Sequence, residues 1–248
     1  MRSVEHKCGV ALLTTLLLLG MVACQNDPVA TDQAVGAASQ NATASEAEDY
    51  TGGEPFDDAE AFFEFNTTDN DLGLQIFLDA EGWRQVTVRD PSKRKIVQIA
   101  ANGPLSEIGI TELRFEGAEP SPAEVLALFP PGDYEFGGKL VEGGKLFSVA
   151  ELSHDFLPAP TFSPSGGQVV DPNNTVVTWS APGAEEVEVI IEDEESGRVL
   201  DIIVPGDIDS LTVPAEFLEP DTEYKLEILA IAENGNRTIA EGFFMTMP

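Results

Sequence analysis

Hydrophobic and polar residues alternate along most of the chain from residue 56 onward, and turn-forming residues interrupt the alternation at short intervals. A period of two places successive side chains on opposite faces of an extended strand. The pattern therefore predicts strands at residues 62–66, 72–79, 83–90, 95–100, 110–116, 133–139 and 145–153, and then at 175–180, 186–193, 198–204, 210–213, 223–232 and 238–246.

One segment departs from this alternation and predicts a helix at residues 121–128. Ser121 can cap its first turn, and Pro122 suits the first helical position because no backbone N–H is needed there. Val125 and Leu126 would contribute to an apolar face of this helix.

The strands fall into two series, separated by the break Leu157-Pro158-Ala159-Pro160. Strands of this length and spacing are typical of antiparallel β-sandwiches. We therefore predict an all-β protein with two tandem antiparallel sandwiches, at residues 56–156 and 157–248.

The second series carries a recognisable motif. A Thr-Trp pair in an early strand, followed by a Leu-x-Pro-x-Thr-x-Tyr run before a later strand, resembles a fibronectin type III domain over about residues 158–248. The resemblance implies that the Tyr224 ring packs in the core beside Trp179, with its hydroxyl bonded to the upstream backbone. The resemblance implies a structural role for Trp179, Leu218, Pro220, Thr222 and Tyr224.

The turn before the last predicted strand reads Asn234-Gly235-Asn236. It does not contain Arg-Gly-Asp, so an integrin-type role has no support.

The first series looks like a diverged relative of the second. Its Phe129-x-Pro131-x-x-Tyr134 run is a shortened form of the tyrosine motif, and residues 131–136 are typical of immunoglobulin-like bacterial modules. The resemblance implies an immunoglobulin-like sandwich at residues 56–156.

Residues 1–23 have the layout of a secretory signal. Arg2 and Lys7 precede an apolar run, which is short for a membrane span and ends in Met21-Val22-Ala23-Cys24. This ending resembles the bacterial lipobox, although methionine replaces the usual leucine. The resemblance implies a lipid on Cys24 and a place in the bacterial cell envelope, anchored to a membrane. Gln25 after the cysteine, by analogy with known sorting, favours the outer membrane over the inner one.

Residues 24–55 are rich in Ala, Ser, Thr, Asn, Gly and acids and contain few large apolar residues. Such a composition buries too little apolar surface to offset chain entropy, so we expect a disordered tether. As a random coil it would span on the order of 30 Å.

The chain after the predicted signal holds 11 Lys and Arg residues and 43 Asp and Glu residues. This excess argues against nucleic acid or an anionic membrane surface as a partner. Solubility or a salty habitat explains it, and divalent-cation binding or a basic partner remain alternatives. With no cysteine besides Cys24, the mature chain contains no disulfide.

Catalytic constellations are scarce. His154 is the one histidine after the signal, and its neighbours Ser153 and Asp155 would point away from it on a strand, so they form no triad. Zinc sites built from several Cys or His are excluded by count. Paired carboxylates could serve a glycoside hydrolase, but they would need a cleft and one raised pKa.

One acidic run has ligand-like spacing, because Asp69, Asn70 and Asp71 stand before Leu72-Gly73. Hard oxygen ligands on a tight turn suit calcium, which makes these residues a candidate metal site. The alternative is a solvated turn in which Asp and Asn bond to the backbone. No other cofactor is expected.

The sequence thus favours a membrane-anchored, non-enzymatic lipoprotein whose sandwiches contact an envelope protein or glycan. A calcium-assisted carbohydrate-binding module is the main alternative, and exposed aromatic residues on one sheet face would indicate it. A glycoside hydrolase-type enzyme is the third possibility.

Overall fold

The computed structural model describes residues 49–248. The predicted signal, Cys24 and residues 25–48 of the predicted tether lie outside the described residues. The strands are β1 (Asp58–Asn66), β2 (Asp71–Arg89), β3 (Lys95–Ala100), β4 (Ile110–Glu116), β5 (Gly132–Leu140), β6 (Lys145–Leu152), β7 (Thr161–Ser163), β8 (Gln168–Val170), β9 (Val176–Ser180), β10 (Glu186–Asp193), β11 (Arg198–Pro205), β12 (Ser210–Thr212), β13 (Glu223–Ile231) and β14 (Arg237–Thr246). The helices are α1 (Leu105–Ile108) and α2 (Pro122–Leu128).

Each predicted strand overlaps a strand of the structure, with three differences. The two strands predicted at residues 72–79 and 83–90 form one long strand, β2. The short strands β7 and β8 and the helix α1 were not predicted. Helix α2 begins as expected, because the Ser121 N–H and hydroxyl both donate to the Glu124 carboxylate.

Strand β2 organises the first core. Its first half pairs with β1 and β4, and its second half, from Trp83, pairs with β3 and β5. Strand β6 extends the second layer beside β5. Leu78, Trp83 and Val88 are fully buried between these layers, and irregularities in the pairing on both sides of Trp83 turn its side chain inward.

Two sheets enclose the second core. One contains β12, β9 and β7, and the other contains β11, β10, β13 and β14, with β8 parallel to β14. Trp179, Val189, Tyr224 and Phe244 pack between them. The fold is a β-sandwich, as the resemblance to fibronectin type III domains implies.

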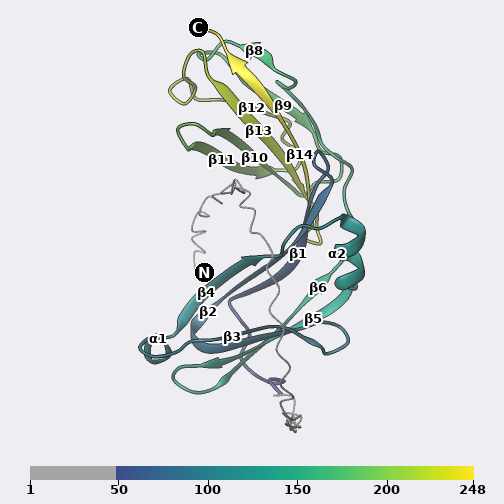
Figure 1. Cartoon of the computed structure of the whole chain (residues 1–248), viewed down its shortest axis with the longest axis vertical. Coiled ribbons are helices and arrows are strands. Elements are labelled where there is room, and N and C mark those ends of the chain that lie inside the picture. Colours follow the sequence, from purple (N-terminus) through teal and green to yellow (C-terminus); the bar gives the residue numbers. More distant parts are fainter. Residues whose placement is uncertain (1–48) are drawn as a thin grey trace, which may run out of the picture. The chain divides into compact units, whose positions relative to one another are not determined.

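Strand β14 also pairs in parallel with β1, which joins the two series of strands (Figure 1). The hydrogen-bonded path therefore runs without a break from β11 to β6. This pairing departs from the purely antiparallel prediction. It arises because β1 and β14 each have a free edge, and pairing satisfies the backbone groups of both edges.

The buried apolar residues form two clusters, one before residue 157 and one after it. The domain boundary at this residue stays a prediction. Neither of the helices within residues 49–248 is long and apolar enough to cross a membrane.

Residues 49–55, which sequence analysis assigned to the tether, lie against β5 and β6. The Tyr50 side chain is 4% exposed and its ring covers Gly137, where any larger side chain would clash. The Tyr50 hydroxyl accepts a hydrogen bond from the Gln85 amide at 3.3 Å. Glu54 forms a parallel bridge to Leu146 on β6. The packed part of the chain therefore includes residues before the predicted boundary at residue 56.

Candidate functional site

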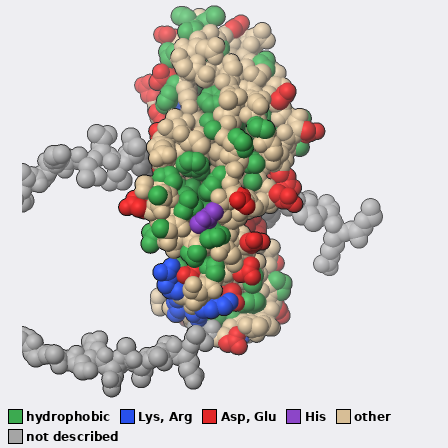
Figure 2. All heavy atoms as spheres, turned by 90° about the vertical axis from the view of Figure 1, so that its right-hand side faces the viewer, with side chains coloured by type: hydrophobic (Ala, Val, Ile, Leu, Met, Phe, Trp, Pro, Cys, Tyr) green, Lys and Arg blue, Asp and Glu red, His purple; other side chains and the backbone are tan. Residues whose placement is uncertain are grey.

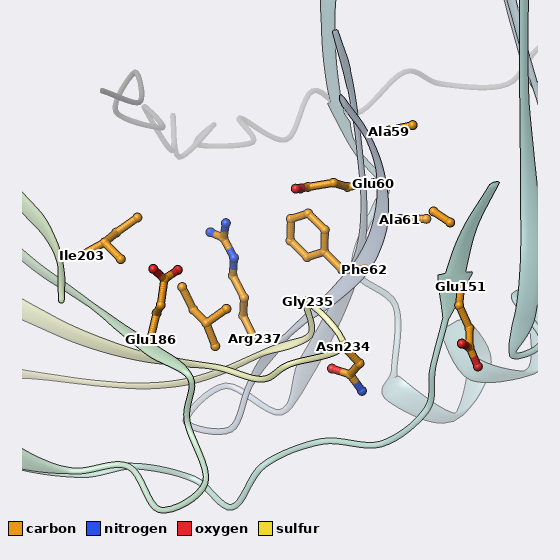
Figure 3. Close-up of a pocket in the computed structure, with 12 residues that line it drawn as sticks. Ala59, Glu60, Ala61, Phe62, Glu151, Glu186, Ile203, Asn234, Gly235 and Arg237 are labelled. Atoms are coloured by element: carbon orange, nitrogen blue, oxygen red, sulfur yellow. The ribbon is translucent and has the colours of Figure 1, made fainter. Parts of the chain in front are cut away.

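A groove of about 290 Å³ lies where β1, β6, β10, β11, β13 and β14 come together, beside the turn between β13 and β14 (Figure 3). We call it the junction groove. Its lining combines apolar and polar side chains: Ala59, Ala61, Phe62, Ala150, Ile203 and Ile231 are apolar, and Glu60, Glu151, Glu186, Asn234 and Arg237 are polar.

The acids of the junction groove come from three separate strands. Glu60 stands on β1, Glu151 on β6 and Glu186 on β10, and all three side chains are exposed. Desolvation raises the pKa of Glu60, and the neighbouring Asp58 carboxylate adds to the rise. The rim is therefore negative on several sides.

Arg237 is the one cation among the described residues of the lining. Its Nη1 atom lies 3.1 Å from a carboxylate oxygen of Glu64 and 3.1 Å from one of Glu188. Its guanidinium also stands 4.9 Å from the centre of the Phe62 ring (Figure 3). The charge of Arg237 is therefore matched by the carboxylates of Glu64 and Glu188.

Glu188 is 8% exposed and forms a carboxyl–carboxyl hydrogen bond with Asp201 on the neighbouring strand β11. Burial is the main cause that raises the pKa of Glu188 to about 7, and Asp201 adds to the rise while Arg237 opposes it. The two carboxyl groups of a glycoside hydrolase stand about 5 Å or more apart, which leaves room for the bond that is cleaved. A directly hydrogen-bonded pair does not have this geometry.

The turn between β13 and β14 is held against the first series of strands. The Asn236 side-chain oxygen accepts a hydrogen bond from the Phe63 N–H at 2.9 Å. Its amide nitrogen donates to the carbonyl oxygens of Ser153 and Asp155. Asn234 donates to the same Asp155 oxygen. The side chains of this turn are therefore engaged in contacts within the chain.

The predicted calcium ligands lie in the turn between β1 and β2. Asn70 has a φ of 57°, a left-handed conformation that asparagine tolerates well. The Asn66 side-chain oxygen accepts hydrogen bonds from the Thr68 and Asp69 backbones. Asn66, which precedes the acidic run, thus bonds to the backbone of the turn.

Asp71 lies beside a pair of glutamates on and after β4. Desolvation raises the pKa of Glu119 to about 7, and Asp71 and Glu116 add to the rise. A Cβ atom at Gly73 would lie 3.1 Å from a Glu119 oxygen and 3.3 Å from a Glu116 oxygen, so this glycine leaves room for the pair. Across residues 49–248, no three His, Cys, Asp or Glu side chains are arranged to hold a metal ion. Calcium binding by Asp69, Asn70 and Asp71 stays a prediction.

His154 has a packing role. Its Nε2 atom lies 2.8 Å from the Phe129 carbonyl oxygen, and its ring packs edge-on against Phe63 at 5.8 Å. These contacts fix the segment that leaves β6.

Both tyrosine motifs form the bond that the sequence implies. The Tyr224 hydroxyl accepts a hydrogen bond from the Glu219 N–H at 2.7 Å, and its ring stacks on Phe244. In the first series, the Tyr134 hydroxyl donates to the Pro130 carbonyl at 3.0 Å. Of the other motif residues, Leu218 and Trp179 are buried in the second core, whereas Pro220 and Thr222 lie in the turn before β13.

The aromatic residues provide no open platform. The sequence contains two tryptophans and three tyrosines, and each of them is at most 6% exposed. Phe243, which is 39% exposed, is the one large aromatic side chain that is exposed within residues 49–248. The described surface thus lacks the row of aromatic rings that would indicate a carbohydrate-binding face.

Sequence analysis did not identify the junction groove. Glu60, Glu186 and Arg237 belong to strands whose pairing depends on residues far apart in the chain, and no local motif marks them. Arg237 is the one residue of the groove that the sequence could have marked as unusual, because it is one of only three basic residues after residue 157 in an acidic chain.

No protein-family model matches the sequence, and no curated protein matches it. Among solved structures, it is similar to the FN1–FN3 domains of chicken CNTN1, with a TM-score of 0.36 and 15% identity over 79% of this chain and 66% of that one. A two-domain fibronectin type III segment of chicken tenascin has a TM-score of 0.32 and 14% identity, over 76% and 98% of the chains. A 1.5-MDa bacterial ice-binding adhesin has a TM-score of 0.29 and 14% identity, over 76% and 65%. This chain spans about two thirds of the CNTN1 and adhesin structures, and its sandwich fold rests on its own strand pairings.

Proposed function

We propose that the protein is a non-enzymatic lipoprotein of the bacterial cell envelope that binds a partner protein through the junction groove. The lipid would be attached to Cys24 and would hold the chain on a membrane, by preference the outer membrane. The acyl chains of such an anchor give stable attachment when more than one is present.

The single observation that carries the binding role is the composition of the junction groove. Three exposed acids line the groove together with apolar side chains, and the one cation of the lining is already paired with Glu64 and Glu188. A Lys or Arg side chain of a partner would meet negative charge at the rim and apolar surface for its methylene stem. We therefore expect a basic segment of an envelope protein as the partner.

A protein partner fits better than a glycan. Carbohydrate-binding faces use exposed aromatic rings, and the tryptophans and tyrosines of this chain are buried. The overall negative charge supports the same choice, because it raises the rate of encounter with basic proteins.

The binding role can be tested by capture from an envelope extract of the native bacterium. The bait is the mature chain, compared with a Glu60→Gln, Glu186→Gln variant. A Glu112→Gln, Glu223→Gln variant serves as the control, because both residues are exposed, lie outside the groove and change the net charge equally.

We expect a basic protein that the parent and the control retain and that the groove variant loses. Equal capture by all three baits would contradict the role of the groove. Loss with the control as well as the groove variant would show that net charge alone governs retention.

A further inference from the structure

The positive charge of this acidic chain is concentrated in one place. Five of the eleven Lys and Arg residues after Cys24 lie within residues 84–95, a stretch with a single acid, Asp90. Asp90 is buried and is paired with Arg94 at 2.9 Å. Figure 2 shows Lys and Arg side chains gathered near the bottom of the view, whereas Asp and Glu side chains are spread over much of the rest.

The strand pairings extend this concentration onto β5 and β6. Arg89 lies opposite Lys95 of β3, and Gln85, four residues before Arg89 on the same side of β2, lies opposite Lys139 of β5. Lys139 in turn lies opposite Lys145 of β6. Because side chains alternate along a strand, these residues share the side of the sheet that faces away from the buried Val86 and Val88.

We call this side the basic face. It is defined by Arg89, Lys93, Lys95, Lys139 and Lys145. Lys93 joins it through its ion pair with Glu135, which lies opposite Arg89. Lys95 reaches along it to the Gln98 side chain at 2.6 Å.

Acids occur on the same side as well, and the Asp49 carboxylate interacts electrostatically with Lys145. Glu135 is matched by Lys93 at 2.6 Å. Asp133 and Glu151 lie opposite each other beyond Glu135, at the end of the face where Glu151 lines the junction groove.

The N-terminal segment enters the described structure on the basic face. The Lys145 ammonium donates to the Asp49 carbonyl oxygen at 2.6 Å. The Tyr50 ring covers Gly137, which lies two residues before Lys139 on the same side of β5. The first described residues, Asp49 and Tyr50, therefore lie beside side chains of the basic face.

We infer that the basic face lies on the anionic headgroups of the phospholipid membrane to which the chain is anchored. The inference rests on the proposed attachment of Cys24 to that membrane. The basic face is a second surface, separate from the junction groove, and its partner is a lipid and not a protein.

Electrostatics favours this orientation. An anionic surface attracts Lys and Arg within about one Debye length, roughly 8 Å at physiological ionic strength, and repels the acidic remainder of the chain. Cys24 precedes Asp49 by 25 residues, so the anchor holds the basic face within at most about 90 Å of the membrane. Because the anchor at Cys24 already holds the chain on the membrane, contact between the basic face and the headgroups is intramolecular. A weak attraction is then sufficient to orient the basic face toward the membrane.

The experiment replaces the acyl group so that it does not depend on lipidation in the cell. The mature chain carries Cys24→Ser and an N-terminal histidine tag, and it is held on vesicles that contain a nickel-chelating lipid. The sequence has no other cysteine after the signal, so a single introduced cysteine can be labelled with a fluorophore. Ser92→Cys places the label in the exposed turn beside the basic face, and Asn173→Cys places it in an exposed turn of the second series.

Energy transfer to an acceptor on the lipid headgroups is then measured on phosphatidylcholine vesicles with and without phosphatidylglycerol. We expect transfer from the Ser92→Cys label to rise when phosphatidylglycerol is present and to fall back at high salt, with no rise from the Asn173→Cys label. Adding Lys95→Glu should abolish the rise. Arg198→Glu, which changes the charge equally at an exposed site of the second series, should leave it unchanged.

Equal transfer on both kinds of vesicle, or equal loss with Lys95→Glu and Arg198→Glu, would overturn the inference. A rise from the Asn173→Cys label in place of the Ser92→Cys label would overturn it as well. Because the tag replaces the acyl group, none of these outcomes bears on whether Cys24 is acylated in the cell.

Discussion

The Asn236 side-chain oxygen accepts a hydrogen bond from the Phe63 backbone N–H at 2.9 Å, across 173 residues of sequence. The same side chain donates to the carbonyl oxygens of Ser153 and Asp155, and it is 1% exposed. One asparagine thus bonds to three backbone groups of the first series of strands, of which the Phe63 N–H is buried. It holds the turn from which β14 continues into its parallel pairing with β1.

Replacing this side chain should be costly. We expect Asn236→Ala to lower the free energy of unfolding by about 2–4 kcal/mol, because buried N–H and C=O groups would lose their partners. Chemical denaturation of the mature chain measures the change. Asn174→Ala, at an exposed turn residue, should change it little, and an equal loss in both variants would contradict the role of Asn236.

The tyrosine corner gives a second test. Tyr224→Phe removes the acceptor of the Glu219 N–H and keeps the ring in place, so we expect a loss of about 1–2 kcal/mol in unfolding free energy. Tyr134→Phe should have a similar effect in the first core, because Pro130 loses its donor. If urea denaturation shows neither variant to be weaker than the parent, ring packing alone stabilises these corners.

Stability should fall as the pH rises from about 5 to 8. The folded-state pKa of Glu119 and of Glu188 is about 7, above the ordinary glutamate value of 4.5, so the folded state holds more protons than the unfolded state between these values. Stability is then highest below the unfolded pKa and is lost as the pH passes through the folded one. Melting temperatures should fall less with pH in Glu119→Gln and in Glu188→Gln than in the parent. Glu223→Gln, an exposed control, should follow the parent, and parallel curves for all four proteins would refute the assignment.

Calcium and magnesium should act alike on the first series of strands. Within residues 49–248 no three acidic side chains are arranged to hold a metal ion, so both ions should screen the acidic surface and give equal small rises in melting temperature. Asp69→Asn with Asp71→Asn should leave these rises unchanged. A calcium-selective rise that the double substitution removes would establish a cation site, because magnesium demands a tighter octahedral geometry.

Local patterns predicted local structure well. The alternation identified the strands because one side of each strand is buried, as the buried Val187, Val189 and Ile191 of β10 show. The motif around Tyr224 predicted a specific hydrogen bond, since its donor lies five residues away. Strands β7 and β8 have three residues each, too few to show a period.

Pairings between distant segments were beyond the reach of such patterns. The parallel register of Glu64 with Arg237 follows from two free strand edges meeting, which neither segment reveals alone. Gly137 gave no sign that the Tyr50 ring would cover it, because that contact joins the supposed tether to β5. The net charge of the chain did not indicate the basic face, because a sum over all residues does not show where the positive charges lie in the fold.

The most direct test of the envelope assignment is the fate of a Cys24→Ala chain in the native bacterium. Cells are fed a fatty acid that can be tagged, and acylation, processing and membrane association of the variant are compared with those of the parent. Because the lipid would be attached to the Cys24 thiol, we expect the variant to lose the acyl label and either leave the membrane fraction or remain an unprocessed precursor. A Cys24→Ala chain that is still acylated, matures normally and stays membrane-bound would contradict the proposal that this protein is a lipoprotein anchored through Cys24.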